Sequence, residues 1–185
     1  MDENKLIETK ISGKDVFCGK IMTVQLDTVR LPNGKEATRE LIRHKGAVCI
    51  LPLTENGEVI VERQFRYPLN SVLLEIPAGK LDFVGEDPLE AAKRELREET
   101  GIKAKKMTYM GEYIGSPAML DERIHMYLAE DLSYGECDYD EDEFMSLDRI
   151  PLDKLVEMIL NGEVADGKTQ AAALRVYVMK KKDKK

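Results

Sequence analysis

The 185 residues carry a formal net charge of −7 and are 43% hydrophobic, which suits one folded domain with its own core. This composition excludes a disordered chain, and the acidic balance excludes a protein that coats nucleic acid or an anionic membrane. Three scattered cysteines and two histidines form no metal-binding spacing, and no apolar run is long enough for a signal peptide or membrane span. We therefore expect a cytoplasmic protein with reduced thiols.

The first half of the chain is predicted to consist of strands. Alternating or continuous apolar runs indicate strands near 6–11, 15–30, 37–43, 47–51, 59–61 and 72–76. Pro32-Asn33-Gly34 and Glu55-Asn56-Gly57 have turn composition and separate neighbouring strands. The run at 47–51 is apolar throughout, which is typical of a strand buried on both faces.

Pro77-Ala78-Gly79 is expected to end the sixth strand and to begin a loop that continues to Asp87. A helix follows, because Asp87 can cap it, Pro88 suits its first position and Gly101 ends it. Later strands are expected near 107–114, 123–130 and 143–149, and helices at 152–160 and 168–179. The element order predicts an α+β fold in which helices cover a mixed sheet as an α/β/α sandwich, with an antiparallel extension of strands at the amino end.

The central helix carries an unusual group of carboxylates. Glu95 and Glu99 are four residues apart and Glu98 is three from Glu95, so the three share one helix face. Like charges at this spacing destabilise a helix by roughly 0.2–0.5 kcal/mol per pair. A cation with a preference for oxygen ligands would reverse the sign of that interaction, and Mg²⁺ is the first candidate, with Mn²⁺ as the alternative.

From Glu86 onward these residues resemble the Nudix box: seven residues lead to Arg94-Glu95-Leu96, and Glu98, Glu99, Gly101 and Ile102 follow at the family's spacing. Six residues separate Gly79 from Glu86 where the family pattern has five, so we expect a small bulge around Phe83-Val84-Gly85. A solvated charged helix face is the alternative interpretation of the carboxylates.

The resemblance implies roles for single residues. Glu95, Glu99 and the backbone carbonyl of Ala78 would bind metal, and Glu98 would bind metal or orient a water. Arg94 would pair with Glu86 and hold the carboxylates in place. Metal ions would neutralise the oxygens of a diphosphate and position a water for attack on phosphorus.

Downstream residues resemble the ADP-ribose pyrophosphatase branch of the family. Pro117 follows Gly101 by 16 residues, as in that branch, although a lone proline also suits an ordinary turn. Gln64-Phe65-Arg66 resembles a strand end whose arginine contacts the substrate diphosphate, so Arg66 is the candidate. Arg39 and Glu40 are candidate adenine contacts, or simply exposed strand charges. The amino-terminal strands of this branch exchange across a homodimer.

The acidic run from Asp138 to Glu143 has two interpretations that remain open. A calcium loop is rejected, because its sixth position is Glu143 instead of glycine and its twelfth is Arg149 instead of glutamate. In the resembling family, a loop before such a strand supplies the catalytic glutamate, and Glu143, which precedes Phe144, matches best. Glu141 is the second choice. A solvated acidic loop is the alternative.

The resemblance thus implies a strand segment at 1–44, exchanged in a dimer, and a hydrolase domain at 45–185. The expected activity is Mg²⁺-dependent hydrolysis of the diphosphate of ADP-ribose to AMP and ribose 5-phosphate. Another nucleotide sugar or a dinucleotide is the alternative substrate. A sensor domain that binds without cleaving is the third hypothesis, which the retained Glu95, Glu98 and Glu99 disfavour.

Overall fold

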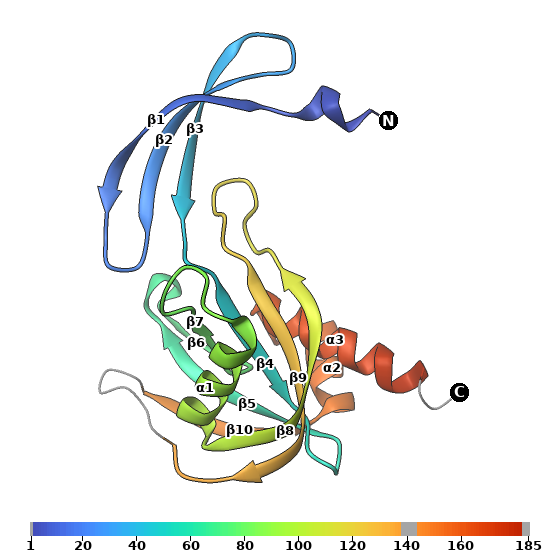
Figure 1. The fold of residues 1–185 in the computed structure, drawn as a ribbon. Helices are drawn as coiled ribbons and strands as arrows, with labels where there is room; N and C mark the ends of the chain where they lie inside the picture. The colour runs from blue at the N-terminus through green and yellow to red at the C-terminus, as the bar shows by residue number, and fades with distance from the viewer. Residues whose placement is uncertain (1, 138–143, 183–185) are drawn as a thin grey trace. The chain divides into compact units, whose positions relative to one another are not determined.

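The computed structural model describes residues 2–137 and 144–182, which form two compact units (Figure 1). Unit 1 comprises Met1–Lys45 and Ile114–Glu122, and unit 2 comprises Gly46–Tyr113 and Arg123–Lys185. Across the described parts of the chain, every helix is too short or too polar to cross a bilayer.

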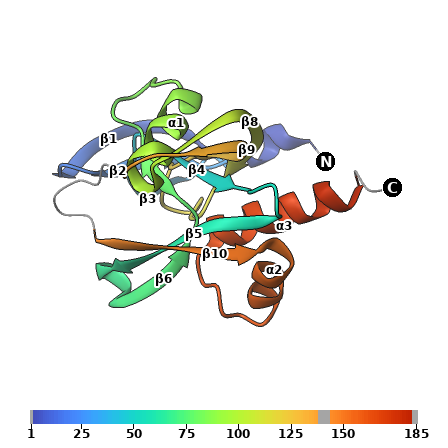
Figure 2. The ribbon, with the colours of Figure 1, turned by 90° about the horizontal axis from the view of Figure 1, so that it is seen from below.

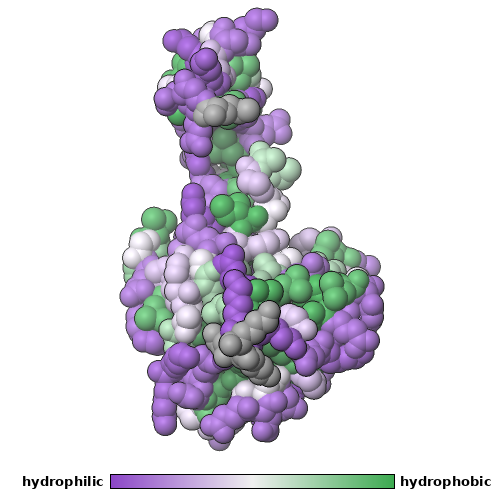
Figure 3. Space-filling view, turned by 90° about the vertical axis from the view of Figure 1, so that its right-hand side faces the viewer, coloured by the Kyte–Doolittle hydropathy of each residue, from purple (hydrophilic) through white to green (hydrophobic). Residues whose placement is uncertain are grey.

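Unit 1 is an antiparallel sheet in the order β1-β2-β3, built from β1 (Thr9–Cys18), β2 (Thr23–Arg30) and β3 (Glu36–Arg43), after a short 3-10 helix η1 (Glu3–Leu6). The predicted turn at Pro32-Asn33-Gly34 is confirmed: Gly34 has φ +83° and its N–H donates to the carbonyl of Leu31 at 2.8 Å. Apolar residues lie among polar ones along the surface of this unit (Figure 3). Exposed members include Ile7, Ile11, Val16, Phe17, Ile21 and Met22.

Unit 2 contains two sheets. The four-stranded sheet has the order β7-β4-β9-β8, with β4 (Ala47–Pro52) parallel to β9 (Ile124–Tyr134) and antiparallel to β7 (Ala78–Lys80), and β8 (Ile102–Tyr113) antiparallel to β9. The three-stranded antiparallel sheet has the order β10-β5-β6, from β10 (Met145–Pro151), β5 (Glu58–Arg66) and β6 (Ser71–Glu75), and η2 (Tyr67–Leu69) joins β5 to β6.

Strand β4 divides the core of unit 2 into two layers. All six of its residues are buried, as its continuous apolar sequence predicts. Val48 and Ile50 belong to the cluster that includes the helix α1 (Pro88–Thr100). Cys49 and Leu51 belong to the cluster that includes α2 (Leu152–Leu160) and α3 (Gly167–Lys182). Figure 2 shows α1 and α3 on opposite sides of this sheet, which confirms the predicted sandwich of the α+β class.

The helix α1 begins and ends where the sequence predicts. The Asp87 carboxylate accepts a hydrogen bond from the N–H of Leu89 at 2.9 Å, and Pro88 is the first helical residue. Gly101 at φ +67° ends the helix with its N–H on the carbonyl of Arg97. Ala92 and Leu96 are buried against the sheet, which fixes the orientation of the remaining helix faces.

Several predicted boundaries were wrong. The strands expected near 6–11 and 15–30 are β1, which runs unbroken through residues 12–14, and β2, and the break between them lies at residues 19–22. The segment after Pro77, expected to be loop, contains the short strand β7, because Ala78 pairs with Cys49 at the edge of the four-stranded sheet. Strand β8 begins at Ile102 rather than near residue 107, since the chain enters the sheet directly after the Gly101 turn. The first part of β8 is rich in lysine, which hid its strand character.

Candidate metal and diphosphate site

The carboxylate face of α1 lies against the strand β7. Glu99 is only 4% exposed, and its Oε2 accepts a hydrogen bond from the N–H of Ala78 at 2.9 Å. Ala78 itself is held in the sheet opposite Cys49. The helix thus presents Glu99 to the same short backbone segment from which the resemblance implies a carbonyl ligand.

The carboxylate of Glu95 occupies the space that a side chain at position 79 would fill. A Cβ added to Gly79 would lie 2.0 Å from Cδ of Glu95 and 2.2 Å from each of its oxygens. Atoms cannot approach so closely, so glycine at position 79 is what allows Glu95 to rest on the β7 backbone.

Arg94 is the shared cation of the acidic cluster, which we define as Asp82, Glu86, Glu95 and Glu98. Its guanidinium lies 2.7 Å from Glu95, 3.3 Å from Glu98 and 3.5 Å from Asp82 and Glu86. Its Nη2 also donates to the carbonyl of Lys80 at 3.3 Å. Burial acts to lower the pKa of Arg94, but the charge and hydrogen bond of Glu95 outweigh it and raise the pKa.

The acidic cluster places four carboxylates around the guanidinium of Arg94. A fifth carboxylate, Glu99, lies on α1, and the guanidinium of Arg97 pairs with Glu98 at 2.7 Å. Within residues 2–137 and 144–182, no three His, Cys, Asp or Glu side chains converge closely enough to hold an ion as they stand. The carboxylates converge on Arg94 instead. The donor set still suits a hard divalent cation, since it consists of carboxylate oxygens in excess over the neighbouring positive charge.

The loop between β7 and α1 contains the extra residue that the sequence shows. It turns at Phe83-Val84-Gly85, where Gly85 has φ +91° and the N–H of Glu86 donates to the carbonyl of Phe83 at 3.2 Å. The N–H of Asp82 donates to the Glu86 carboxylate at 2.7 Å. The added residue is thereby absorbed in a turn, and α1 keeps its regular register.

Arg66 ends β5 and its guanidinium is paired within the protein. Its Nε and Nη2 donate to the two oxygens of Glu75 at 2.7 Å and 2.8 Å. The Arg66 side chain is 38% exposed, whereas that of Glu75 is 2% exposed. The hydrogen bond that Arg66 donates to Glu75 is the largest influence on the pKa of Arg66 and raises it above the usual arginine value. The cation is thus fixed on one side and accessible on the other.

The remaining predicted residues fall in two places. Arg39, Glu40 and Pro117 belong to unit 1, where Arg39 pairs with Glu8 and Pro117 begins the turn that ends with the Leu120 N–H on the Ser116 carbonyl. Glu40 of β3 lies opposite Leu26 of β2. Glu141 and Glu143 lie outside the described residues.

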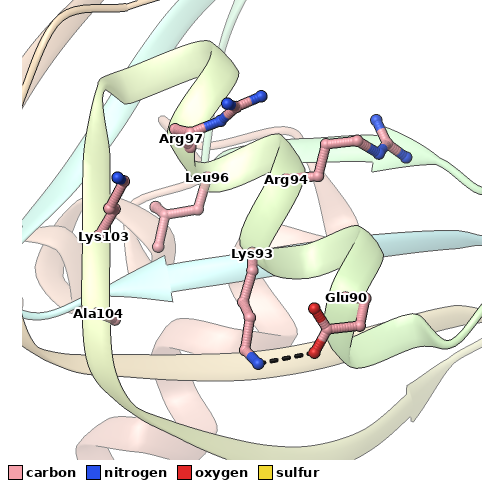
Figure 4. A pocket seen from close by; sticks show the side chains of 7 residues that line it. All are labelled: Glu90, Lys93, Arg94, Leu96, Arg97, Lys103 and Ala104. Atoms are coloured by element: carbon pink, nitrogen blue, oxygen red, sulfur yellow. Dashed lines mark hydrogen bonds and ion pairs between the residues drawn. The ribbon is translucent and has the colours of Figure 1, made fainter.

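A cavity of about 410 Å³ lies beside α1, away from the carboxylates of Glu95 and Glu99. Figure 4 shows Glu90 and Lys93 paired at one end, with the guanidinium groups of Arg94 and Arg97 directed away from that pair. The cavity is lined largely by the stems of long side chains along the helix and by Lys103 and Ala104 of β8. It is a depression between α1 and β8 that shares Arg94 with the acidic site but none of the carboxylates of the acidic cluster.

Sequence analysis gave no role to Asp82, Glu75 and Lys168, which the structure places in contact with candidate site residues. Glu75 and Lys168 are buried charges that meet across the fold, from the end of β6 and the start of α3. The signal available for Glu75 was a charged residue that closes an apolar strand. Nothing in the spacing could have paired it with a lysine 93 residues away.

Comparison with known proteins gives matches over nearly the whole chain. Residues 43–173 match the model of the NUDIX domain, and residues 8–42 match that of the nucleoside diphosphate sugar hydrolase N-terminal domain. The chain is 43% identical to the ADP-ribose pyrophosphatase of Bacillus subtilis (strain 168), with 90% of this chain and 91% of the relative covered. It is 41% identical to the methanol dehydrogenase activator of Bacillus methanolicus, with 91% and 92% covered. A crystal structure of an ADP compounds hydrolase has the same fold, with a TM-score of 0.83 at 24% identity over 96% of this chain and 97% of that one.

Proposed function

We propose that this chain, which belongs to the NUDIX family, hydrolyses the diphosphate of ADP-ribose to AMP and ribose 5-phosphate with the help of Mg²⁺ or Mn²⁺. The observation that carries the proposal is the acidic cluster around Arg94, beside a Glu99 that is bonded to the backbone of Ala78. The 43% identity to an ADP-ribose pyrophosphatase over 90% of the chain supports the choice of substrate.

Glu95, Glu98, Glu99 and the carbonyl of Ala78 are the proposed metal ligands. A bound divalent ion would neutralise diphosphate oxygens and lower the pKa of a coordinated water. The protein supplies the geometry. Helix α1 packs on the sheet through Leu96, and Ala78 is fixed by its place in β7. The positive charge of Arg94 offsets the repulsion between the carboxylates.

The substrate diphosphate is assigned to Arg66, whose planar guanidinium suits phosphate oxygens. Arg39, Glu40 and Pro117 are proposed to contact the adenosine side of the substrate. The general base is assigned to Glu143, with Glu141 as the alternative, because a carboxylate close to the attacking water can take its proton.

An assay with a panel of substrates tests the proposal. ADP-ribose, other nucleotide sugars, dinucleotides and nucleoside triphosphates are incubated with the protein and Mg²⁺, and the products are separated by chromatography. We expect AMP and ribose 5-phosphate from ADP-ribose, and no release after chelation of the metal by EDTA. A higher kcat/KM for another nucleotide sugar would replace ADP-ribose as the substrate, and a higher value for triphosphates would remove the assignment to this branch.

We also propose a cytoplasmic homodimer. Unit 1 leaves several large apolar side chains exposed, and exposed apolar surface is typical of protein interaction sites. The three cysteines are all free thiols, as expected of a reducing compartment. Sedimentation of the full chain tests the dimer: a mass near twice 21.0 kDa is expected, and a mass of one chain at micromolar concentration would contradict it.

A further inference from the structure

The start of α3 carries a buried cation. The Lys168 side chain is 10% exposed, its ammonium group donates to Oε2 of Glu75, and it lies 3.2 Å from the carboxylate of Asp166. A buried charge is costly unless it is paired and hydrogen-bonded. Here the cation has two carboxylate neighbours, and Glu75 in turn has two cations, Lys168 and Arg66.

Through Glu75, Lys168 is joined to the candidate diphosphate arginine. Glu75 holds Nε and Nη2 of Arg66, and within the described residues Nη1 makes no hydrogen bond of its own. Two nitrogens of the guanidinium are already held by a nearly buried carboxylate. The side chain therefore loses little further conformational freedom when a ligand binds the third nitrogen, Nη1. The ammonium of Lys168 fixes the same carboxylate from the other side.

The same helix start also holds the backbone that leads to Ala78. The buried Oγ1 of Thr169 accepts a hydrogen bond from the N–H of Ile76 at 2.9 Å and donates to Asp166 at 2.5 Å. Asp166 also accepts from the N–H of Thr169, as a helix cap does. Two residues after Ile76, the N–H of Ala78 reaches Glu99. One helix terminus therefore fixes both the β6–β7 link and the Glu75 carboxylate.

We propose that Lys168 is a positioning residue for substrate binding: through Glu75 it holds the guanidinium of Arg66 ready for the diphosphate of the nucleotide substrate. This inference rests on the proposed function for the identity of the substrate. The direction of the pKa values agrees with it. Burial raises the pKa of Glu75, but the hydrogen bond from Arg66 and the charge of Lys168 outweigh it and keep the carboxylate ionised. Burial likewise lowers the pKa of Lys168, but Asp166 and Glu75 outweigh it, so the ammonium stays charged.

Steady-state kinetics of full-length variants with ADP-ribose and Mg²⁺ test the inference. Lys168→Met removes the charge at similar length, and we expect KM to rise about tenfold or more with kcat within about threefold, because binding is lost before chemistry. Lys168→Arg keeps the charge and should restore most of the affinity. In an Arg66→Lys background, Lys168→Met should add less than about threefold, since both changes act on one guanidinium.

Lys180→Met is the matched control, because Lys180 lies on the same helix and pairs with Glu130 at 2.5 Å, a carboxylate outside the network. Its KM should equal that of the wild type. An unchanged KM in a folded Lys168→Met variant would overturn the inference. The same fold-increase in KM from Lys168→Met in the wild-type and Arg66→Lys backgrounds would overturn it as well. Should Lys168→Met not fold, the KM and kcat of Glu75→Asp decide instead. This change keeps the negative charge and withdraws the carboxylate from Arg66 and Lys168 by the length of one methylene, so KM should rise while kcat stays within about threefold.

Binding of ADP, measured by calorimetry, separates this inference from the proposed function. Weaker ADP binding in Lys168→Met but not in Lys180→Met supports the positioning role even if the wild type does not cleave ADP-ribose. If the wild type turns over ADP-ribose but Lys168→Met binds ADP with unchanged affinity, the positioning role is contradicted and the proposed function stands.

Discussion

Replacement of Gly79 by alanine probes the contact between β7 and the Glu95 carboxylate. The new Cβ would lie 2.0 Å from Cδ of Glu95, so the carboxylate must leave its position on the backbone. Gly79 is not among the residues with positive φ, so alanine can adopt its backbone conformation without strain. The effect therefore isolates the displacement of Glu95.

The size of the effect follows from the contacts that Glu95 makes. Moving the carboxylate breaks its 2.7 Å hydrogen bond with Arg94. A hydrogen bond to a charged group contributes about 1.5–3 kcal/mol, which partial exposure of the pair reduces to about 1–2 kcal/mol. Glycine-to-alanine replacement at a compatible position contributes the opposite sign, about 0.4–1 kcal/mol of stabilisation through the unfolded chain.

A double-mutant cycle measures this contact. The free energy of unfolding is determined in urea for wild type, Gly79→Ala, Glu95→Ala and the double variant. With Glu95 truncated, Gly79→Ala should stabilise the protein, so the two backgrounds should differ by about 1–2 kcal/mol. Turnover of the Gly79→Ala single variant should fall at least about tenfold, because a candidate metal ligand has moved. An equal effect of Gly79→Ala in both backgrounds would refute the contact.

Three further variants address the chemistry, the base and the buried ion pair. Glu99→Gln should remove most turnover while circular dichroism stays that of the wild type, and near-normal activity would place the metal elsewhere. Glu143→Gln should lower kcat more than it raises KM, and an unchanged kcat would move the base to Glu141 or to a metal-bound group. Burial raises the pKa of Glu75, but the bond from Arg66 and the charge of Lys168 lower it on balance. The ionised Glu75 carboxylate therefore stabilises the fold above about pH 4.3, and this stabilisation is lost as the pH falls through the lowered pKa of the folded state. The free energy of unfolding in urea should depend less on pH in that window for Glu75→Gln than for the wild type.

The central helix could be predicted from sequence because its signals are local. The Asp87 cap, Pro88 and Gly101 each act within one turn, and the spacing of Ala92 and Leu96 sets the buried face. The fold class followed equally well from the order of elements. Strand β7 was missed because three residues with a proline before them carry no periodic signal, and the pairing of Ala78 with Cys49 supplies the information instead.

The parts of the site that escaped prediction depend on contacts between distant segments. The group of carboxylates on α1 was visible from their spacing, and the resemblance implied the pairing of Arg94 with Glu86. The approach of Asp82 to Arg94 was not foreseen, because it depends on how the preceding loop turns. The pairing of Arg66 with Glu75 requires knowledge that β5 and β6 are neighbours, and that of Glu75 with Lys168 requires the position of α3. Residue types suggested each partner as a charge, and only the fold places them together.

Direct measurement of Mn²⁺ binding without substrate tests the central claim, that the carboxylates of α1 gather a divalent cation. The electron paramagnetic resonance signal of free Mn²⁺ is followed while protein is added, for the wild type, Glu99→Gln, and Glu90→Gln as a control on the same helix outside the acidic cluster. We predict loss of the free-ion signal with wild type and with Glu90→Gln, at affinities that match one another, and at least about tenfold weaker binding with Glu99→Gln. Equal binding by all three proteins would contradict the account.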